Sequence, residues 1–208
     1  MQRIATWLGL LIGSGGLLLQ FYVSLSLRFA QGFDLVSTLV FFFTYYTIVT
    51  NIMLVLIYLS DVADWRWLDW WRTPVVRGMM AGAIALVGIF NHLLLAQLQD
   101  LTGLRSLADT ILHYITPTWF VLWWLLFQPK QRLKLGDIPV MLLPTLIWLG
   151  WAMARGAVVN EYPYPILDAT KLGYGQVAIN CVFVFIGLLL IYLVVIGLDG
   201  VLGRAKNA

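Results

Sequence analysis

The most constraining feature of this chain is a series of apolar runs of about 20 residues, the length an α-helix needs to cross a bilayer core. Of the 208 residues, 61% are hydrophobic and 11% are charged, whereas typical soluble domains are about 25% charged. The runs lack the alternating pattern of a transmembrane β-barrel. We therefore predict an all-α integral membrane protein in which residues 1–208 form a single transmembrane helical domain.

Six apolar segments are predicted to span the membrane. Their bounds are roughly Ile4–Leu27, Val36–Leu59, Val76–Leu98, Thr110–Phe127, Ile138–Met153 and Tyr174–Leu198. If the N-terminus is cytoplasmic, the inner segments carry more Lys and Arg than the outer ones, as the positive-inside rule requires. The inner residues are Arg3, Arg66, Arg72, Arg77, Lys130, Arg132, Lys134, Arg204 and Lys206, and the outer ones are Arg28, Arg105, Arg155 and Lys171. This predicts a six-transmembrane-helix bundle with both termini cytoplasmic. Short loops and the lack of a targeting segment favour a bacterial inner (cell) membrane.

The second apolar segment contains hydrogen-bonding side chains where little water is available. FFFTYYTIVTNIMLVLIYL, residues 41–59, includes Thr44, Thr47, Thr50 and Asn51. Thr44 and Thr50 are expected to bond carbonyls of their own helix, as threonines in membrane helices do. In a straight helix Thr47 would lie ~16 Å below the outer surface, at 1.5 Å per residue.

Other spans also carry polar residues at membrane depth, where such groups usually face the bundle interior. They are Asn91, His92, His113 and Asn180. With the predicted topology all of them fall in the outer half of the membrane. We therefore expect one cavity that opens outward or sideways. Each amide can instead form a hydrogen bond between helices, and each histidine can have a structural role rather than act as a base.

Three stretches resemble the androgen-induced-protein family of membrane proteins, bacterial members included. They are TYYTIVTNIMLVL, LHYITPTWFVLWWLLF and EYPYPILD, in that order, and the resemblance runs from the second span to the end of the chain. It implies an intramembrane threonine hydrolase that cleaves fatty acid esters of hydroxy fatty acids. Thr47 and His113 match the family's catalytic residues. Tyr162 and Tyr164 match a family loop, which we expect at the cavity mouth.

The chemistry implied for the pair is nucleophilic catalysis. A threonine hydroxyl needs a base to take its proton as it attacks an ester, and a neutral imidazole is suitable. Straight helices would leave Thr47 and His113 up to ~8–10 Å apart in depth, so His92 is an alternative base. Asn51, one turn below Thr47, is the first candidate for an oxyanion donor. Asn91, Asn180, Tyr162 and Tyr164 are further candidates for substrate binding.

The expected partners are the bilayer and a membrane lipid or fatty-acid ester substrate. No cofactor, metal ion or nucleic acid is expected, and Cys181 is the only cysteine. Two other functions fit the same residues. One is a b-type haem electron carrier with His92 and His113 as axial ligands. The other is a non-catalytic lipid-binding or transport protein.

Overall fold

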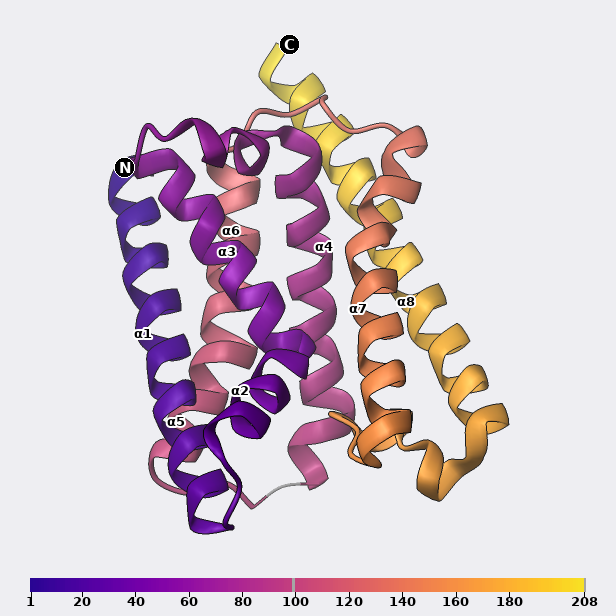
Figure 1. Ribbon diagram of the computed structural model, residues 1–208. Coiled ribbons are helices and arrows are strands. Elements are labelled where there is room, and N and C mark those ends of the chain that lie inside the picture. Colours follow the sequence, from indigo (N-terminus) through magenta and orange to yellow (C-terminus); the bar gives the residue numbers. More distant parts are fainter. Residues whose placement is uncertain (99, 208) are drawn as a thin grey trace.

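The structure, a computed structural model, describes residues 1–98 and 100–207. Within these residues the chain is helical and contains no strand, as predicted. The long helices run side by side, and the N- and C-termini lie at the same end of the bundle (Figure 1). Short segments at this end include the 3₁₀ helices η1 (Arg66–Arg72) and η5 (Leu135–Asp137).

Among the described residues, five helical segments are long and apolar enough to cross a membrane. They comprise α1 (Gln2–Ala30); α4, η2 and η3 (Pro74–Phe90, Asn91–Leu95, Ala96–Leu98); α5, η4 and α6 (Leu104–Thr110, Ile111–Ile115, Thr116–Phe127); η5 and α7 (Ile138–Val159); and α8 (Ala169–Asn207). The fifth predicted segment is longer than expected, because α7 continues through Pro144 to Val159. The backbone of Gly173 is non-helical, so the regular part of α8 begins at the predicted Tyr174.

The predicted second span is not one straight helix. It is divided into α2 (Leu35–Thr44) and α3 (Tyr46–Val62), whose axes meet at 77°. The extended backbone of Tyr45 makes the break. Thr44 therefore does not lie on the same helix as Thr47 and Asn51. The chain also does not descend ~16 Å along one straight helix before it reaches Thr47.

Two aromatic side chains satisfy backbone groups that the break releases. The indole Nε1 of Trp148 donates to the carbonyl oxygen of Thr44 at 2.8 Å, and the backbone N–H of Thr47 donates to the hydroxyl of Tyr164 at 3.3 Å. In a membrane, non-helical backbone is tolerated only where protein or trapped water supplies such partners. The break is thus built into the packing of α3 against α7 and the α7–α8 loop.

Helix α4 lies at the centre of the bundle and packs against α3, α6, α7 and α8. Every residue from Val76 to Ile84 is buried, the pattern of a helix surrounded by protein. At Gly82 an added methyl group would lie 2.5 Å from the Tyr192 ring of α8, so only glycine permits this close approach. The other long helices bury one side and leave large apolar side chains exposed.

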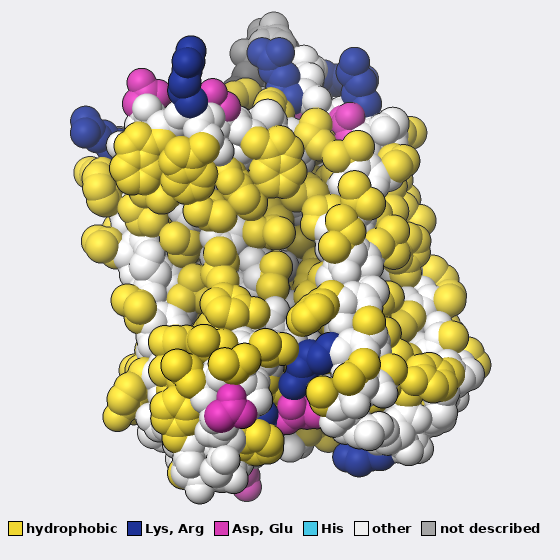
Figure 2. All heavy atoms as spheres, viewed as in Figure 1, with side chains coloured by type: hydrophobic (Ala, Val, Ile, Leu, Met, Phe, Trp, Pro, Cys, Tyr) yellow, Lys and Arg dark blue, Asp and Glu magenta, His cyan; other side chains and the backbone are white. Residues whose placement is uncertain are grey.

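The surface matches a protein surrounded by lipid. Figure 2 shows hydrophobic side chains over the broad middle of the visible face and charged ones toward the two ends. Trp65, Trp67 and Trp70 are exposed near η1, beside Arg66 and Arg72. Tryptophan mixed with charge is typical of the headgroup layer.

Replacement of Trp148 tests how the break is held. Trp148→Phe keeps an aromatic ring but leaves the Thr44 carbonyl without its donor, so we expect a loss of about 1–3 kcal/mol in the free energy of unfolding. Chemical unfolding in detergent, followed by circular dichroism, measures it. Trp151→Phe on the same helix is the control, because Trp151 is half-exposed. Equal stability of the two variants would contradict this role.

Candidate functional site

Thr47 lies in the first turn of α3, immediately after the break. At this position its backbone N–H has no partner within the helix, because the first four N–H groups of any α-helix lack one. The aligned peptide dipoles also give this end of α3 a partial positive charge. The Thr47 side chain thus lies beside a donor and a dipole that both favour a developing negative charge.

His113 faces Thr47 from the neighbouring helix. Its Nε2 lies 3.1 Å from Thr47 Oγ1, and its Nδ1 lies 2.8 Å from Oδ1 of Asp109, one turn earlier. A carboxylate can only accept a hydrogen bond, so the Nδ1 proton points to Asp109. Nε2 then carries the lone pair that faces the threonine hydroxyl. The three side chains form a Thr–His–Asp relay in which each group orients the next.

Two π-helical turns flank the site. His113 belongs to η4 and Asn91 to η2. A π-turn inserts one extra residue into a helix, redirects nearby side chains and occurs often at functional sites. The two turns are adjacent in space, since the rings of His92 in η2 and Tyr114 in η4 make an edge contact with their centres 6.2 Å apart.

Tyr164, in the loop between α7 and α8, completes the group. Its hydroxyl oxygen lies 3.3 Å from both the backbone nitrogen and Oγ1 of Thr47. The ring makes edge contacts with Tyr45 and Phe90 and a tilted contact with Trp148. Burial raises the pKa of the Tyr164 hydroxyl, even though the hydrogen bonds with Thr47 act against it. Tyr164 therefore remains a hydrogen-bond donor at neutral pH.

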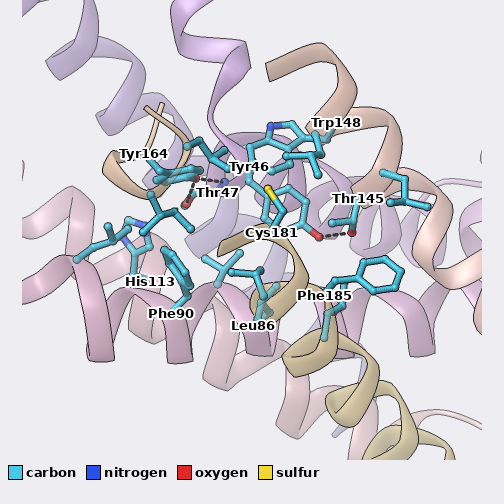
Figure 3. Close-up of a pocket in the computed structure, with 18 residues that line it drawn as sticks. Tyr46, Thr47, Leu86, Phe90, His113, Thr145, Trp148, Tyr164, Cys181 and Phe185 are labelled. Carbon is cyan, nitrogen blue, oxygen red and sulfur yellow. Dashed lines mark hydrogen bonds between the residues drawn. The ribbon is translucent and has the colours of Figure 1, made fainter. Parts of the chain in front are cut away.

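The residues Thr47, His113 and Tyr164 lie where two cavities meet. The first, between α3, α4, α7 and α8, is apolar and takes in about 740 Å³, its open mouth included. Figure 3 shows the three residues together at one end of it, with Thr145 and Phe185 toward the other. The second cavity takes in about 1380 Å³, its open mouth included, and mixes polar and apolar side chains; we call it the polar cavity because it holds the charged ones. Its lining includes Gln20, Ser24, Arg28, Arg105, Asp109 and Glu161.

Asn51 is placed differently from the expectation for an oxyanion donor. Its Nδ2 donates to the carbonyl oxygens of Thr47 and Leu112, at 2.8 and 3.3 Å, and its Oδ1 accepts from Thr116 Oγ1 at 2.5 Å. The side chain is fully buried. Asn51 therefore joins the backbone of Thr47 to the turn that carries His113, which is the helix-joining alternative.

The structure brings only some of the other predicted residues to the site. Asn91 lines the polar cavity, and its buried Nδ2 has no hydrogen-bond partner within the part of the chain that the structure describes. His92 is exposed and makes an edge contact with Tyr114. Asn180 donates to the Ile166 carbonyl at 2.9 Å and thereby ties the α7–α8 loop to α8. Neither His92 nor Asn180 lines either of the two large cavities.

Tyr162 supports the loop rather than the cavity. It packs so closely on α7 that a methyl group on Gly156 would lie 2.1 Å from its ring, and it lines neither of the two large cavities. Thr44 and Thr50 are not part of the site either. Their hydroxyls donate to the carbonyl oxygens of Val40 and Tyr46, four residues earlier, as predicted.

Sequence reasoning missed Asp109, Trp148 and Arg28. Asp109 precedes His113 by four residues, and this spacing places both on one helix face, so the signal was available. Trp148 was hidden among ten tryptophans. Arg28 was counted only as an outer charge, although its side chain is buried.

Comparison with known proteins adds no assignment. No family model matches the chain, and neither the curated proteins nor the solved structures contain a significant match.

Replacement of Asn51 separates a joining role from an oxyanion role. Asn51→Ala removes three hydrogen bonds from a buried position, so we expect a loss of about 1–3 kcal/mol in the free energy of unfolding. Asn180→Ala, at a half-buried amide, is the control and should cost less than about 1 kcal/mol. Chemical unfolding in detergent measures both. An Asn51→Ala protein of unchanged stability would contradict the joining role.

Proposed function

We propose that this protein is an intramembrane hydrolase that cleaves lipid esters, with Thr47 as nucleophile and His113 as general base. The observation that carries the proposal is the 3.1 Å contact between Thr47 Oγ1 and His113 Nε2, with Asp109 behind the imidazole. A nucleophile, a base within hydrogen-bond reach and a third group that orients the base is the general arrangement for covalent catalysis. The resemblance of three sequence stretches to the androgen-induced-protein family implies the same chemistry. It also implies the substrate class, fatty acid esters of hydroxy fatty acids.

The reaction would proceed in two halves. Thr47 Oγ1 attacks the ester carbonyl carbon while its proton passes to His113 Nε2. The tetrahedral intermediate collapses, the C–O bond to the alcohol breaks, and the alcohol leaves with the proton from His113. A water molecule, deprotonated by His113, then attacks the acyl-threonine, and the proton returns to Thr47 as the fatty acid leaves. Base assistance of this kind typically contributes about 10²–10⁴-fold.

Two donors are available for the oxyanion. The Thr47 backbone N–H points out of the first turn of α3, and the Tyr164 hydroxyl lies 3.3 Å from it. In the resting state the tyrosine oxygen accepts from this N–H, so it occupies the position that a substrate oxyanion would take. An entering carbonyl oxygen would displace it and could then receive a hydrogen bond from the tyrosine O–H. An oxyanion donor, once in place, contributes about 10²–10³-fold. The unpartnered Nδ2 of Asn91 is a further candidate donor to substrate.

The two cavities suggest how the ester lies. The apolar cavity suits an acyl chain that enters from the bilayer, and the polar cavity suits water and the alcohol portion. The ester bond would then lie at their junction, beside Thr47. A reaction between a lipid and water needs access to both media, and this junction supplies it.

We further infer that the bent pair α2–α3 counts as one crossing, which gives six spans with both termini cytoplasmic in a bacterial inner membrane. The shared end of the two termini and the excess of Lys and Arg there support this orientation. The site then lies in the outer half of the membrane.

The two alternative functions fit less well. Haem ligation by His113 would require it to leave Thr47 or Asp109, since both ring nitrogens have protein partners. A non-catalytic lipid-binding protein would use the apolar cavity equally well, but it gives no reason for the Thr47, His113 and Asp109 relay.

Alanine variants of the pair test the proposal. Thr47→Ala removes the nucleophile and should reduce hydrolysis of a palmitoyl hydroxy-fatty-acid ester to background. His113→Ala removes the base and should reduce it about 10²–10⁴-fold. Thr50→Ala and His92→Ala are matched controls, because Thr50 bonds only helix carbonyls and His92 is exposed. Fatty acid release by purified protein is the measurement. Full activity in a folded Thr47→Ala protein would rule out this mechanism.

Tyr164→Phe tests the oxyanion donor. The ring packing is kept and one hydroxyl is lost, so kcat should fall about 10²–10³-fold while KM changes little. Tyr162→Phe, on the same loop, should leave kcat unchanged. A change confined to KM would assign Tyr164 to substrate binding instead.

A further inference from the structure

A compact charge cluster borders the polar cavity. Glu161 Oε1 accepts from Arg28 Nη1 at 2.5 Å, and Glu161 Oε2 accepts from Arg155 Nη2 at 2.7 Å. A second nitrogen of Arg155 donates to the Glu161 backbone carbonyl at 2.9 Å. One carboxylate therefore serves two guanidinium groups that come from α1 and α7.

The cluster has more positive charge than its own residues balance. The side chains of Arg28 and Arg155 are only 9% and 7% exposed, and the buried Nε atoms of both have no hydrogen-bond partner among the described residues. Burial opposes ionisation of Glu161, but the hydrogen bonds and charges of Arg28 and Arg155 outweigh it and hold its pKa below the usual value. At neutral pH the three groups thus carry a net charge of +1. Buried charge without a counter-charge is costly, which favours binding of an anion.

The aromatic surroundings compensate only part of this excess. The Arg28 guanidinium lies 3.7 Å from the Phe33 ring centre and 4.2 Å from that of Phe41. Such cation–π contacts are worth about 0.5–2 kcal/mol each, but an aromatic ring carries no net charge to neutralise the guanidinium. They also fix the plane of the guanidinium, so that it is preorganised for a ligand.

The position of the cluster relates it to the catalytic pair. Arg28 and Glu161 line the same polar cavity as Thr47 and His113, and so does the exposed Arg105. The fourth charged residue in this lining is Asp109, which is already paired with His113. An anion in the cavity would therefore meet arginine, not an unpaired carboxylate.

We propose that the polar cavity is a binding subsite for an anionic group, a carboxylate or a phosphate, on the alcohol portion of the ester, with Arg28 as its direct contact. This inference rests on the proposed hydrolase. Planar guanidinium groups bind both kinds of anion through paired hydrogen bonds. Arg155 and Glu161 hold Arg28 in place, and Arg105 adds positive charge at the cavity mouth.

The anion belongs to the alcohol portion because the other cavity does not suit it. Among the described residues, the lining of the apolar cavity contains no Lys, Arg, Asp or Glu, so it suits the hydrocarbon chain of the acid. With the ester carbonyl at Thr47, the alcohol portion extends into the polar cavity. The enzyme would thus select esters by the charge of the group that leaves first.

The test compares esters that share a palmitoyl chain and differ in the alcohol portion: a hydroxy fatty acid, the methyl ester of that acid, and glycerol 3-phosphate. For the wild-type protein, KM of the neutral methyl ester should exceed that of the better anionic ester at least about tenfold. The anionic ester with the lower KM shows whether the subsite binds a carboxylate or a phosphate. Arg28→Gln should raise KM for the anionic esters at least about tenfold and leave the neutral ester unchanged.

Matched variants separate charge recognition from stability. Arg28→Lys keeps the charge and should retain most of the preference. Arg105→Gln, at an exposed position, should shift KM in the same direction by less. Arg77→Gln changes a buried arginine that pairs with Asp61 elsewhere in the bundle, and it should not alter the preference. Equal KM values for the charged and methylated esters in the wild type, or an equal shift of both in Arg28→Gln, would overturn the subsite but not the hydrolase.

If no ester is cleaved, the proposed function fails. The subsite can then still be tested by a binding measurement. An amide analogue of the hydroxy-fatty-acid ester should raise the thermal unfolding midpoint of the wild type more than its methyl ester does. Arg28→Gln should abolish this difference. If the charged and the methylated analogue raise the midpoint of the wild type equally, the subsite is overturned, whatever the outcome for catalysis.

Discussion

The interruption of the helix at Tyr45 is the constraint on which the rest of the site depends. A continuous helix would bond the Thr47 N–H to a carbonyl one turn earlier and would present only a side chain. The 77° change of direction instead places Thr47 at a helix N-terminus. That terminus supplies a backbone donor with no partner inside its own helix, and a favourable dipole within the bundle. Trp148 and Tyr164 make the interruption tolerable, because each satisfies a backbone group next to it.

The site joins two environments with different demands. Lipid chains need an apolar space, whereas water and charged groups need polar walls. The Thr47, His113 and Tyr164 group lies at the boundary between such spaces. Asn51 fixes the backbone of Thr47 relative to η4, so the short distance between hydroxyl and imidazole rests on a buried hydrogen-bond network. Such networks are rigid when all members are satisfied.

Sequence reasoning predicted the helical class, most of the spans and the two residues that meet in the site. Periodicity and composition suffice for the first two, because lipid accepts few alternatives to helices. The mismatch in depth between Thr47 and His113 applied to straight helices. It does not arise here, because the second span is bent at Tyr45 and the two side chains lie 3.1 Å apart. No proline or glycine marks the break: Tyr45 lies in an aromatic run, and only tertiary partners such as Trp148 stabilise its extended backbone. The opposite case is Asp109, whose spacing from His113 was visible in the sequence.

The most direct test of the account is to locate a covalent adduct. The wild-type protein is incubated with a fluorophosphonate that carries an alkyl chain, digested, and sequenced by mass spectrometry. The account predicts one adduct, on Thr47 Oγ1, that is lost in His113→Ala and retained in His92→Ala. An adduct on another residue, such as Tyr164 or Cys181, or a Thr47 adduct that forms equally fast without His113, would contradict it.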